Sequence, residues 1–161
     1  ANGHGSELPF EVLHLSEFLG REVESGRLKL RPIEGKRVVT YHDPCKVGRH
    51  GGVFDEPREV LRALGLKHRE MPDHGTMNFC CGGGAGNFLL KHAEPLRQKS
   101  FELKRRQAEE VGAEALVTAC SSCRMSFLGG AEVSGWDRPI ESLVELVGQQ
   151  LDDGVASDAP V

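Results

Sequence analysis

The sequence lacks three features that would place it in other classes of protein. It contains no run of the roughly 18 or more apolar residues needed to span a bilayer. The net charge is −4 at pH 7, whereas proteins that bind nucleic acids or anionic membranes carry a basic excess. No basic start followed by an apolar segment marks a secretory signal. We therefore expect a cytoplasmic protein that neither crosses a membrane nor binds nucleic acid.

A complete set of disulfides is also excluded, because the five cysteines are an odd number. The disulfide framework of a small secreted protein is a poor explanation for them. Single buried cysteines usually act as small hydrophobic residues. Four of these five, however, lie in a Cys-Cys or a Cys-x-x-Cys pair. The pairs favour one thiolate site, used for metal or redox chemistry in a reducing compartment.

The hydrophobic pattern alternates between short strands and amphipathic helices. This alternation predicts an α/β fold, in which a parallel, Rossmann-like sheet carries helices on both faces. We expect a single domain over residues 1–151 and a flexible tail over 152–161, and we expect the basic run 103–107 on the exposed face of its helix. The predicted strands are 10–15, 36–41, 66–71 and 113–119, and the predicted helices are 16–26, 56–65, one within 86–112, one entered at 120–128, and 137–151.

Every cysteine follows a predicted strand. The carboxyl ends of parallel strands meet at one edge of a sheet, where α/β proteins bind their ligands. We therefore expect one site built from three segments, with Cys45 after strand 36–41, Cys80 and Cys81 after strand 66–71, and Cys120 and Cys123 after strand 113–119.

Two local features suit this site to thiolate chemistry. The Cys120-x-x-Cys123 pair lies at a strand-to-helix turn, where two sulfurs point to one place and the positive end of the helix favours thiolate. The glycine-rich stretch 82–86 allows positive φ angles and a close approach of backbone amides to a cluster. His42 and Asp43, just before Cys45, are candidate catalytic residues, as a proton donor or as partners that orient the site. An exposed histidine in an ordinary turn is the alternative.

Five thiolates exceed the four ligands of structural zinc and the four of a standard iron–sulfur cube. The fifth cysteine is then either a bystander or a ligand of an unusual cluster. We favour the second interpretation, in which Cys80 and Cys81 bind different irons of one cluster.

Three motifs carry a resemblance to a known family: "YHDPCKVGRHGGVFDEPREVL", "NFCCGGGAG" and "TACSSCRMSF". Together they resemble the cysteine-rich CCG domain over roughly residues 10–150. This domain occurs in heterodisulfide reductase subunits B and D, in the iron–sulfur subunit of glycolate oxidase, and in a membrane complex associated with sulfite reductase.

The resemblance implies that Cys45, Cys80, Cys81, Cys120 and Cys123 bind a non-cubane 4Fe–4S cluster. It also implies an iron–sulfur electron-transfer domain of an oxidoreductase, which acts on a thiol or disulfide substrate or relays electrons. Its expected partners are other iron–sulfur or membrane-complex electron-transfer subunits, so that the domain would lie at the periphery of such a complex. The chain has one set of cysteines and no ferredoxin-like run, and we expect it to be the C-terminal part of a longer protein.

Two alternatives stay open. The first is a structural zinc site or partner-binding module without redox chemistry, in which zinc takes the place of the cluster. The second is a metal-free thiol–disulfide switch that uses Cys120 and Cys123.

Overall fold

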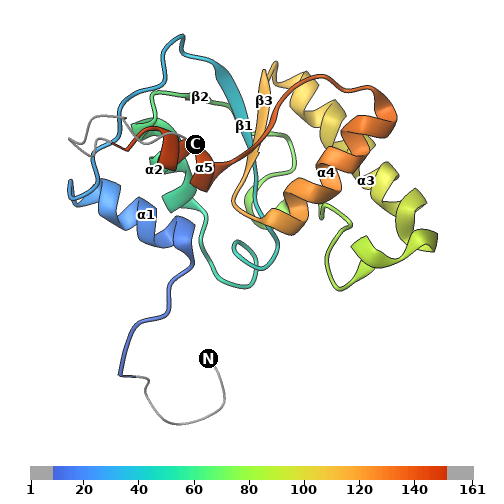
Figure 1. The fold of residues 1–161 in the computed structure, drawn as a ribbon, viewed down its shortest axis with the longest axis horizontal. Coiled ribbons are helices and arrows are strands. Elements are labelled where there is room, and N and C mark those ends of the chain that lie inside the picture. The colour runs from blue at the N-terminus through green and yellow to red at the C-terminus, as the bar shows by residue number, and fades with distance from the viewer. Residues whose placement is uncertain (1–8, 152–161) are drawn as a thin grey trace, which may run out of the picture.

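The computed structural model describes residues 9–151, which form a four-stranded, all-parallel sheet of order β2-β1-β3-β4 (Figure 1). The strands are β1 (Val38–His42), β2 (Lys67–His68), β3 (Ala115–Thr118) and β4 (Ile140–Ser142). The helices are α1 (Leu15–Glu24), α2 (Asp55–Ala63), α3 (Glu94–Glu110), α4 (Ser121–Ser134) and α5 (Leu143–Gln149), with short 3-10 turns at Gly75–Met77, Asn87–Leu89 and Lys91–Ala93.

Helices cover both faces of the sheet, as predicted. Figure 1 shows α1, α2 and α5 on one side and α3 and α4 on the other. Side chains alternate between the two faces along a strand, and β1 follows this rule. Val39 and Tyr41 lie in the core beneath α1, α2 and α5, whereas His42 lies against Phe127 of α4, with ring centroids 4.7 Å apart.

The order of the strands creates a switch point between β1 and β3. The chain leaves β1 to form β2 on one side and later returns to form β3 on the other. In such sheets a crevice opens at the carboxyl ends of the two strands where the order reverses. Cys45 follows β1 and Cys120 follows β3, so the sequence places cysteines on both sides of this crevice.

Two predicted elements are wrong at the ends of the chain. The segment 10–15 is not a strand, because it finds no neighbouring strand in the described part of the chain, and Phe10 and Val12 are 63% and 71% exposed. The predicted helix 137–151 begins instead with β4, which pairs in parallel with β3, and the N–H of Leu116 donates to the carbonyl of Pro139 at 3.0 Å. Only Leu143–Gln149 is helical there.

Other expectations hold with changed bounds or lie outside the described residues. The predicted strand 66–71 shortens to the two-residue edge strand β2. The predicted tail 152–161 lies outside the residues that the structure describes. None of the helices described here combines the length and the apolar character that a bilayer crossing requires.

Candidate functional site

All five cysteines line a single cavity of about 540 Å³ at the carboxyl end of the sheet. Cys81 and Cys123 are buried, Cys45 and Cys120 are half-buried, and Cys80 is exposed. The structure therefore brings together residues that are 78 positions apart at most, from 45 to 123. This placement confirms the expected position of the cysteine site relative to the sheet.

The Cys80–Cys81 loop uses its glycines to approach the sulfurs and α4. Gly82 has φ +74°, and its N–H donates to Cys80 Sγ at 3.4 Å. The N–H of Gly83 donates to Cys81 Sγ at 3.5 Å. A Cβ atom at Gly83 would lie 2.9 Å from Cβ of Ser126 in α4, so this position has no room for a side chain.

The start of α4 favours thiolate at one of its two cysteines. Cys120 is the N-cap residue of this helix. A hydrogen bond from the Cys123 thiol, together with backbone N–H groups at the helix start, lowers the pKa of Cys120 to about 6. Contact with Cys123 also lowers the pKa of Cys81, and the contacts with Cys120 and Cys81 raise the pKa of Cys123. Metal binding requires deprotonated thiols, so the start of the helix favours it at Cys120, whereas Cys123 must still release its proton.

His42 lies beneath the cavity and faces the sulfurs. Its ring is buried, and one of its nitrogens lies with Cys81 Sγ and Cys123 Sγ in a group whose atoms are all within 4.8 Å of one another. Nδ1 lies 3.3 Å from the side-chain amide nitrogen of Asn78. The two N–H groups of that amide have closer acceptors, the carbonyls of Asp43 at 2.6 Å and Phe79 at 3.1 Å, and Nε2 of His42 has no hydrogen-bond partner among the described residues. Burial lowers the pKa of His42, which favours the neutral form.

Asp43 is buried and bonded on both oxygens. Arg58 donates to Oδ1 at 2.8 Å and to Oδ2 at 3.0 Å, and the N–H of Gly75 donates to Oδ2 at 2.8 Å. Arg58 also bonds Glu70 through Nε at 2.5 Å. This network ties the loop after β1 to the loop that leads to Cys80, so it fixes two cysteine-bearing segments relative to each other.

Three residues near the site were not predicted from the sequence: Asn78, Lys104 and His14. Lys104, expected on an exposed face within the run 103–107, is completely buried, and that expectation is wrong for this residue. Its Nζ donates to Oδ1 of Asn78 at 2.9 Å and lies 3.4 Å from Oε1 of Gln107. His14, the N-cap residue of α1, lines the cysteine cavity. The burial of Lys104 could have been predicted from its spacing. It lies three positions after Phe101 and four before Ala108, so it belongs to the apolar stripe of the helix.

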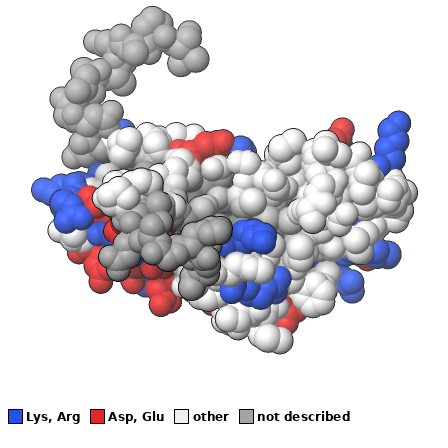
Figure 2. All heavy atoms as spheres, turned by 90° about the horizontal axis from the view of Figure 1, so that it is seen from below, with Lys and Arg blue, Asp and Glu red and all other residues white. Residues whose placement is uncertain are grey.

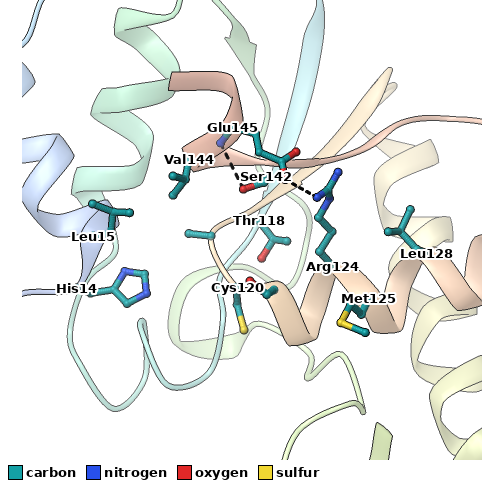
Figure 3. A pocket seen from close by; sticks show the side chains of 12 residues that line it. His14, Leu15, Thr118, Cys120, Arg124, Met125, Leu128, Ser142, Val144 and Glu145 are labelled. Carbon is teal, nitrogen blue, oxygen red and sulfur yellow. Dashed lines mark hydrogen bonds and ion pairs between the residues drawn. The ribbon is translucent and has the colours of Figure 1, made fainter. Parts of the chain in front are cut away.

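A second cavity, of about 440 Å³, adjoins the first (Figure 3). The two cavities share His14, Ala119, Cys120 and Ser121. In Figure 3 the side chain of Arg124 extends away from Cys120 towards Glu145, with which it forms an ion pair at 2.6 Å. Apolar side chains complete the lining: Leu15, Met125, Leu128 and Val144.

Much of the surface seen from below is uncharged. Figure 2 shows a broad area without Lys, Arg, Asp or Glu over the half of the molecule that carries α3 and α4. Several large apolar side chains of this half, or of the loop that leads into it, are exposed: Met77, Phe79, Leu89, Leu90, Leu96, Met125, Leu128 and Val133. Phe79 directly precedes Cys80, so apolar surface reaches the mouth of the cysteine cavity.

Comparisons with known proteins agree with this geometry. A family model described as "Cysteine-rich domain" and named CCG matches residues 39–128, which hold all five cysteines. The chain is 37% identical over 150 residues to a subunit of the dihydromethanophenazine:CoB–CoM heterodisulfide reductase of Methanosarcina barkeri. It is 36% identical over 150 residues to a probable membrane-anchored ferredoxin of Chromohalobacter salexigens. It is 31% identical over 148 residues to the Hdr-like menaquinol oxidoreductase iron–sulfur subunit 2 of Archaeoglobus fulgidus.

These relatives are much longer than the chain. The matches cover 91%, 92% and 86% of this chain, but only 36%, 22% and 26% of the three proteins, in that order. The similarity is therefore to one part of each relative.

Proposed function

Because this chain belongs to the family of cysteine-rich CCG domains, we propose that it is the iron–sulfur domain of an oxidoreductase similar to heterodisulfide reductase. The observation that carries this proposal is that one cavity collects all five cysteines of the chain. The relatives that are oxidoreductase subunits, among them a heterodisulfide reductase subunit and an iron–sulfur subunit, support the same class of activity.

The donor set of the cavity fits an iron–sulfur cofactor. Thiolates are the usual ligands of such clusters, and we assign this role to Cys45, Cys80, Cys81, Cys120 and Cys123. Five ligands exceed those of a standard cube, so we propose a non-cubane 4Fe–4S cluster. When bound, such a group supplies or accepts single electrons.

The surrounding residues hold the thiolates rather than react. The amides of Gly82 and Gly83 donate to two of the sulfurs, which offsets negative charge there. A ring nitrogen of His42 lies within 4.8 Å of the sulfurs of Cys81 and Cys123, so we propose that this ring orients the site. Asp43 uses both oxygens to bind Arg58 and Gly75, so we propose that it positions the loops. Both predicted catalytic residues are thus proposed as positioning residues.

We propose that the domain acts on a thiol or disulfide substrate. The alternative within the same proposal is that it binds no substrate and relays electrons to a partner. The second cavity lies beside Cys120. Its apolar lining and its Arg124–Glu145 ion pair could bind the part of a thiol substrate that lies beyond the sulfur. The apolar surface at the mouth of the site suits contact with another electron-transfer subunit. Such a subunit would place the domain at the cytoplasmic periphery of a membrane complex.

Reconstitution tests the proposal. The anaerobically reconstituted protein should hold about four irons and four sulfides per chain and give an electron paramagnetic resonance signal in one of its oxidation states. Cys45→Ser should lose most of the iron, because Cys45 lines the same cavity as the other four. The matched control is Met77→Ala, at an exposed position outside the cavity lining. Equal iron in Cys45→Ser and the unsubstituted protein would contradict the assigned ligand set.

A zinc site is the second candidate, and one observation favours it. His42, Cys81 and Cys123 present three donor atoms within 4.8 Å of one another, a set that suits tetrahedral zinc. This group does not include Cys45. A colourless protein with about one zinc per chain, and with zinc retained in Cys45→Ser, would support this candidate instead. A protein that takes up neither metal would leave the thiol–disulfide switch.

A further inference from the structure

Lys104 is a buried cation whose two hydrogen-bond partners are neutral amides. Its side chain has no exposed surface, and its Nζ contacts Oδ1 of Asn78 and Oε1 of Gln107. Among residues 9–151 it forms no ion pair with a carboxylate. An ammonium group removed from water is costly unless a negative charge compensates it. The position of Lys104 therefore requires a compensating charge nearby.

The carboxylates near Lys104 supply little of this compensation. Asp73 is separated from the ammonium by Gln107, whose amide nitrogen donates to Asp73 Oδ2 at 2.5 Å. Asp43 is already paired with Arg58 through both oxygens. Burial lowers the pKa of Lys104 to about 8. The groups that act in the opposite direction are these two carboxylates and, beyond them, two thiols, those of Cys81 and Cys123.

A continuous polar path leads from Lys104 to those thiols. The ammonium donates to Asn78 Oδ1, the Asn78 amide nitrogen lies 3.3 Å from His42 Nδ1, and a ring nitrogen of His42 lies within 4.8 Å of Cys81 Sγ and Cys123 Sγ. The two N–H groups of the Asn78 amide donate to the carbonyls of Asp43 at 2.6 Å and Phe79 at 3.1 Å. These bonds fix the Asn78 amide between Lys104 and His42.

We propose that Lys104 is the buried counter-charge of the cysteine site, acting through Asn78 and His42. Five thiolates in one cavity concentrate negative charge, and each electron accepted there adds one more. A fixed positive charge on the closed side of the site, away from solvent, offsets this charge with little screening. Lys104 is in this sense a positioning residue, and the inference rests on the proposed iron–sulfur function.

The test compares Lys104→Met with Lys99→Met after anaerobic reconstitution. Methionine keeps much of the length of the side chain and removes its charge. Lys99 lies on the same helix, but its side chain is 80% exposed and pairs with Glu102 at the surface. We expect the midpoint potential of Lys104→Met, followed by electron paramagnetic resonance in a redox titration, to shift to a more negative value. We also expect a several-fold faster loss of iron to a chelator. Lys99→Met should match the unsubstituted protein in both measurements.

The outcomes separate this inference from the function on which it rests. If Lys104→Met takes up iron and sulfide normally but keeps the unsubstituted potential, the counter-charge role is wrong and the proposed function stands. If the unsubstituted protein takes up neither iron nor sulfide, the proposed iron–sulfur function and the counter-charge role are both wrong. Lys104→Gln, which keeps a hydrogen-bond donor without the charge, replaces Lys104→Met if the latter does not fold. It should show the same direction of shift, whereas a potential restored by the amide alone would contradict a role of the charge.

Discussion

Arg58 and Lys104 are both basic groups held beneath the cysteine cavity, but their partners differ. Arg58 is neutralised within the protein, because it forms paired contacts with Asp43 and Glu70. Lys104 meets only amides. The first residue therefore joins two loops whatever the state of the site, whereas the charge of the second depends on what the site contains. Because of this difference, we expect the titration of Lys104 to make the free energy of unfolding depend on pH.

We predict that the metal-free protein becomes more stable as the pH rises from about 8 to 10.5. Burial lowers the pKa of Lys104 from 10.5 to about 8. Between these values the folded state has released a proton that the unfolded state retains, so the free energy of unfolding increases with pH. The gain is about 3 kcal/mol at most. Chemical denaturation at a series of pH values measures it.

Lys104→Met is the control for this prediction, because other groups also titrate in the same range. The difference in unfolding free energy between Lys104→Met and the unsubstituted protein should be largest near pH 7 and should shrink towards pH 10.5. A difference that stays constant over this range would show that the ammonium is not buried in the folded protein.

At this scale the sequence identified the sulfurs but not their surroundings. The Cys-Cys and Cys-x-x-Cys pairs after strands were enough to predict one cluster of cysteines. Lys104 was assigned to an exposed face because it lies in a run of basic residues. Its burial depends on Asn78, which is 26 positions away. A contact of this kind forms only after the fold has brought the two segments together, so a local pattern does not contain it.

The packing of α3 on α4 depends on one glycine. A Cβ atom at Gly130 would lie 2.3 Å from Cγ of Phe101, a buried residue of α3. The neighbouring Gly129 has open space at the same point. Because α4 also carries Cys120 at its N-cap position and Cys123 in its first turn, a displacement of this helix would move two of the cysteines.

We predict opposite effects for Gly130→Ala and Gly129→Ala. The first substitution forces the two helices apart and should lower the free energy of unfolding by about 1–3 kcal/mol. The second adds a side chain at an exposed helical position and should raise it by up to about 1 kcal/mol. Thermal or denaturant unfolding of both variants measures the two changes in the free energy of unfolding. Equal stability of the two variants would show that α3 and α4 are not in close contact at this point.

The elements inside the sheet were predicted better than those at its ends. The run 36–41 is apolar and β-branched, and it lies at the centre of the sheet as β1. The segment 10–15 has a similar composition but no strand to pair with, so it remains irregular. Residues 137–151 carry a helical spacing, yet Ile140–Ser142 pair with β3. Pairing with a strand 24 positions away in the chain overrides local preference at such positions.

In the whole molecule, Cys45, Cys80 and Cys81 lie where regular structure is sparse, whereas Cys120 and Cys123 lie at the start of α4. The sheet and its helices form two apolar clusters, one on each face. By contrast, Cys45 follows β1 in a loop, and Cys80 and Cys81 lie between the 3-10 turns Gly75–Met77 and Asn87–Leu89. These loops are joined by few groups, chiefly Asp43, Arg49 and Asn78. A cofactor held by all five cysteines would add covalent links between the same segments.

We therefore predict that cofactor loading stabilises the whole domain and orders these loops most. Ligand binding to the folded state alone, at a thousandfold excess over its dissociation constant, contributes about 4 kcal/mol, which for a domain of this size raises the midpoint of thermal unfolding by the order of 10 °C. Calorimetry before and after anaerobic removal of the metal measures the shift. Hydrogen exchange should slow chiefly in residues 43–52 and 72–90, and much less in β1 and β3. A Cys45→Ser protein should show a smaller rise in midpoint and no slowing in 43–52, because its first loop is no longer bound to the other two. If hydrogen exchange slowed uniformly across the domain, the protein alone would already hold these loops in place. The five cysteines would then form their pocket without the metal.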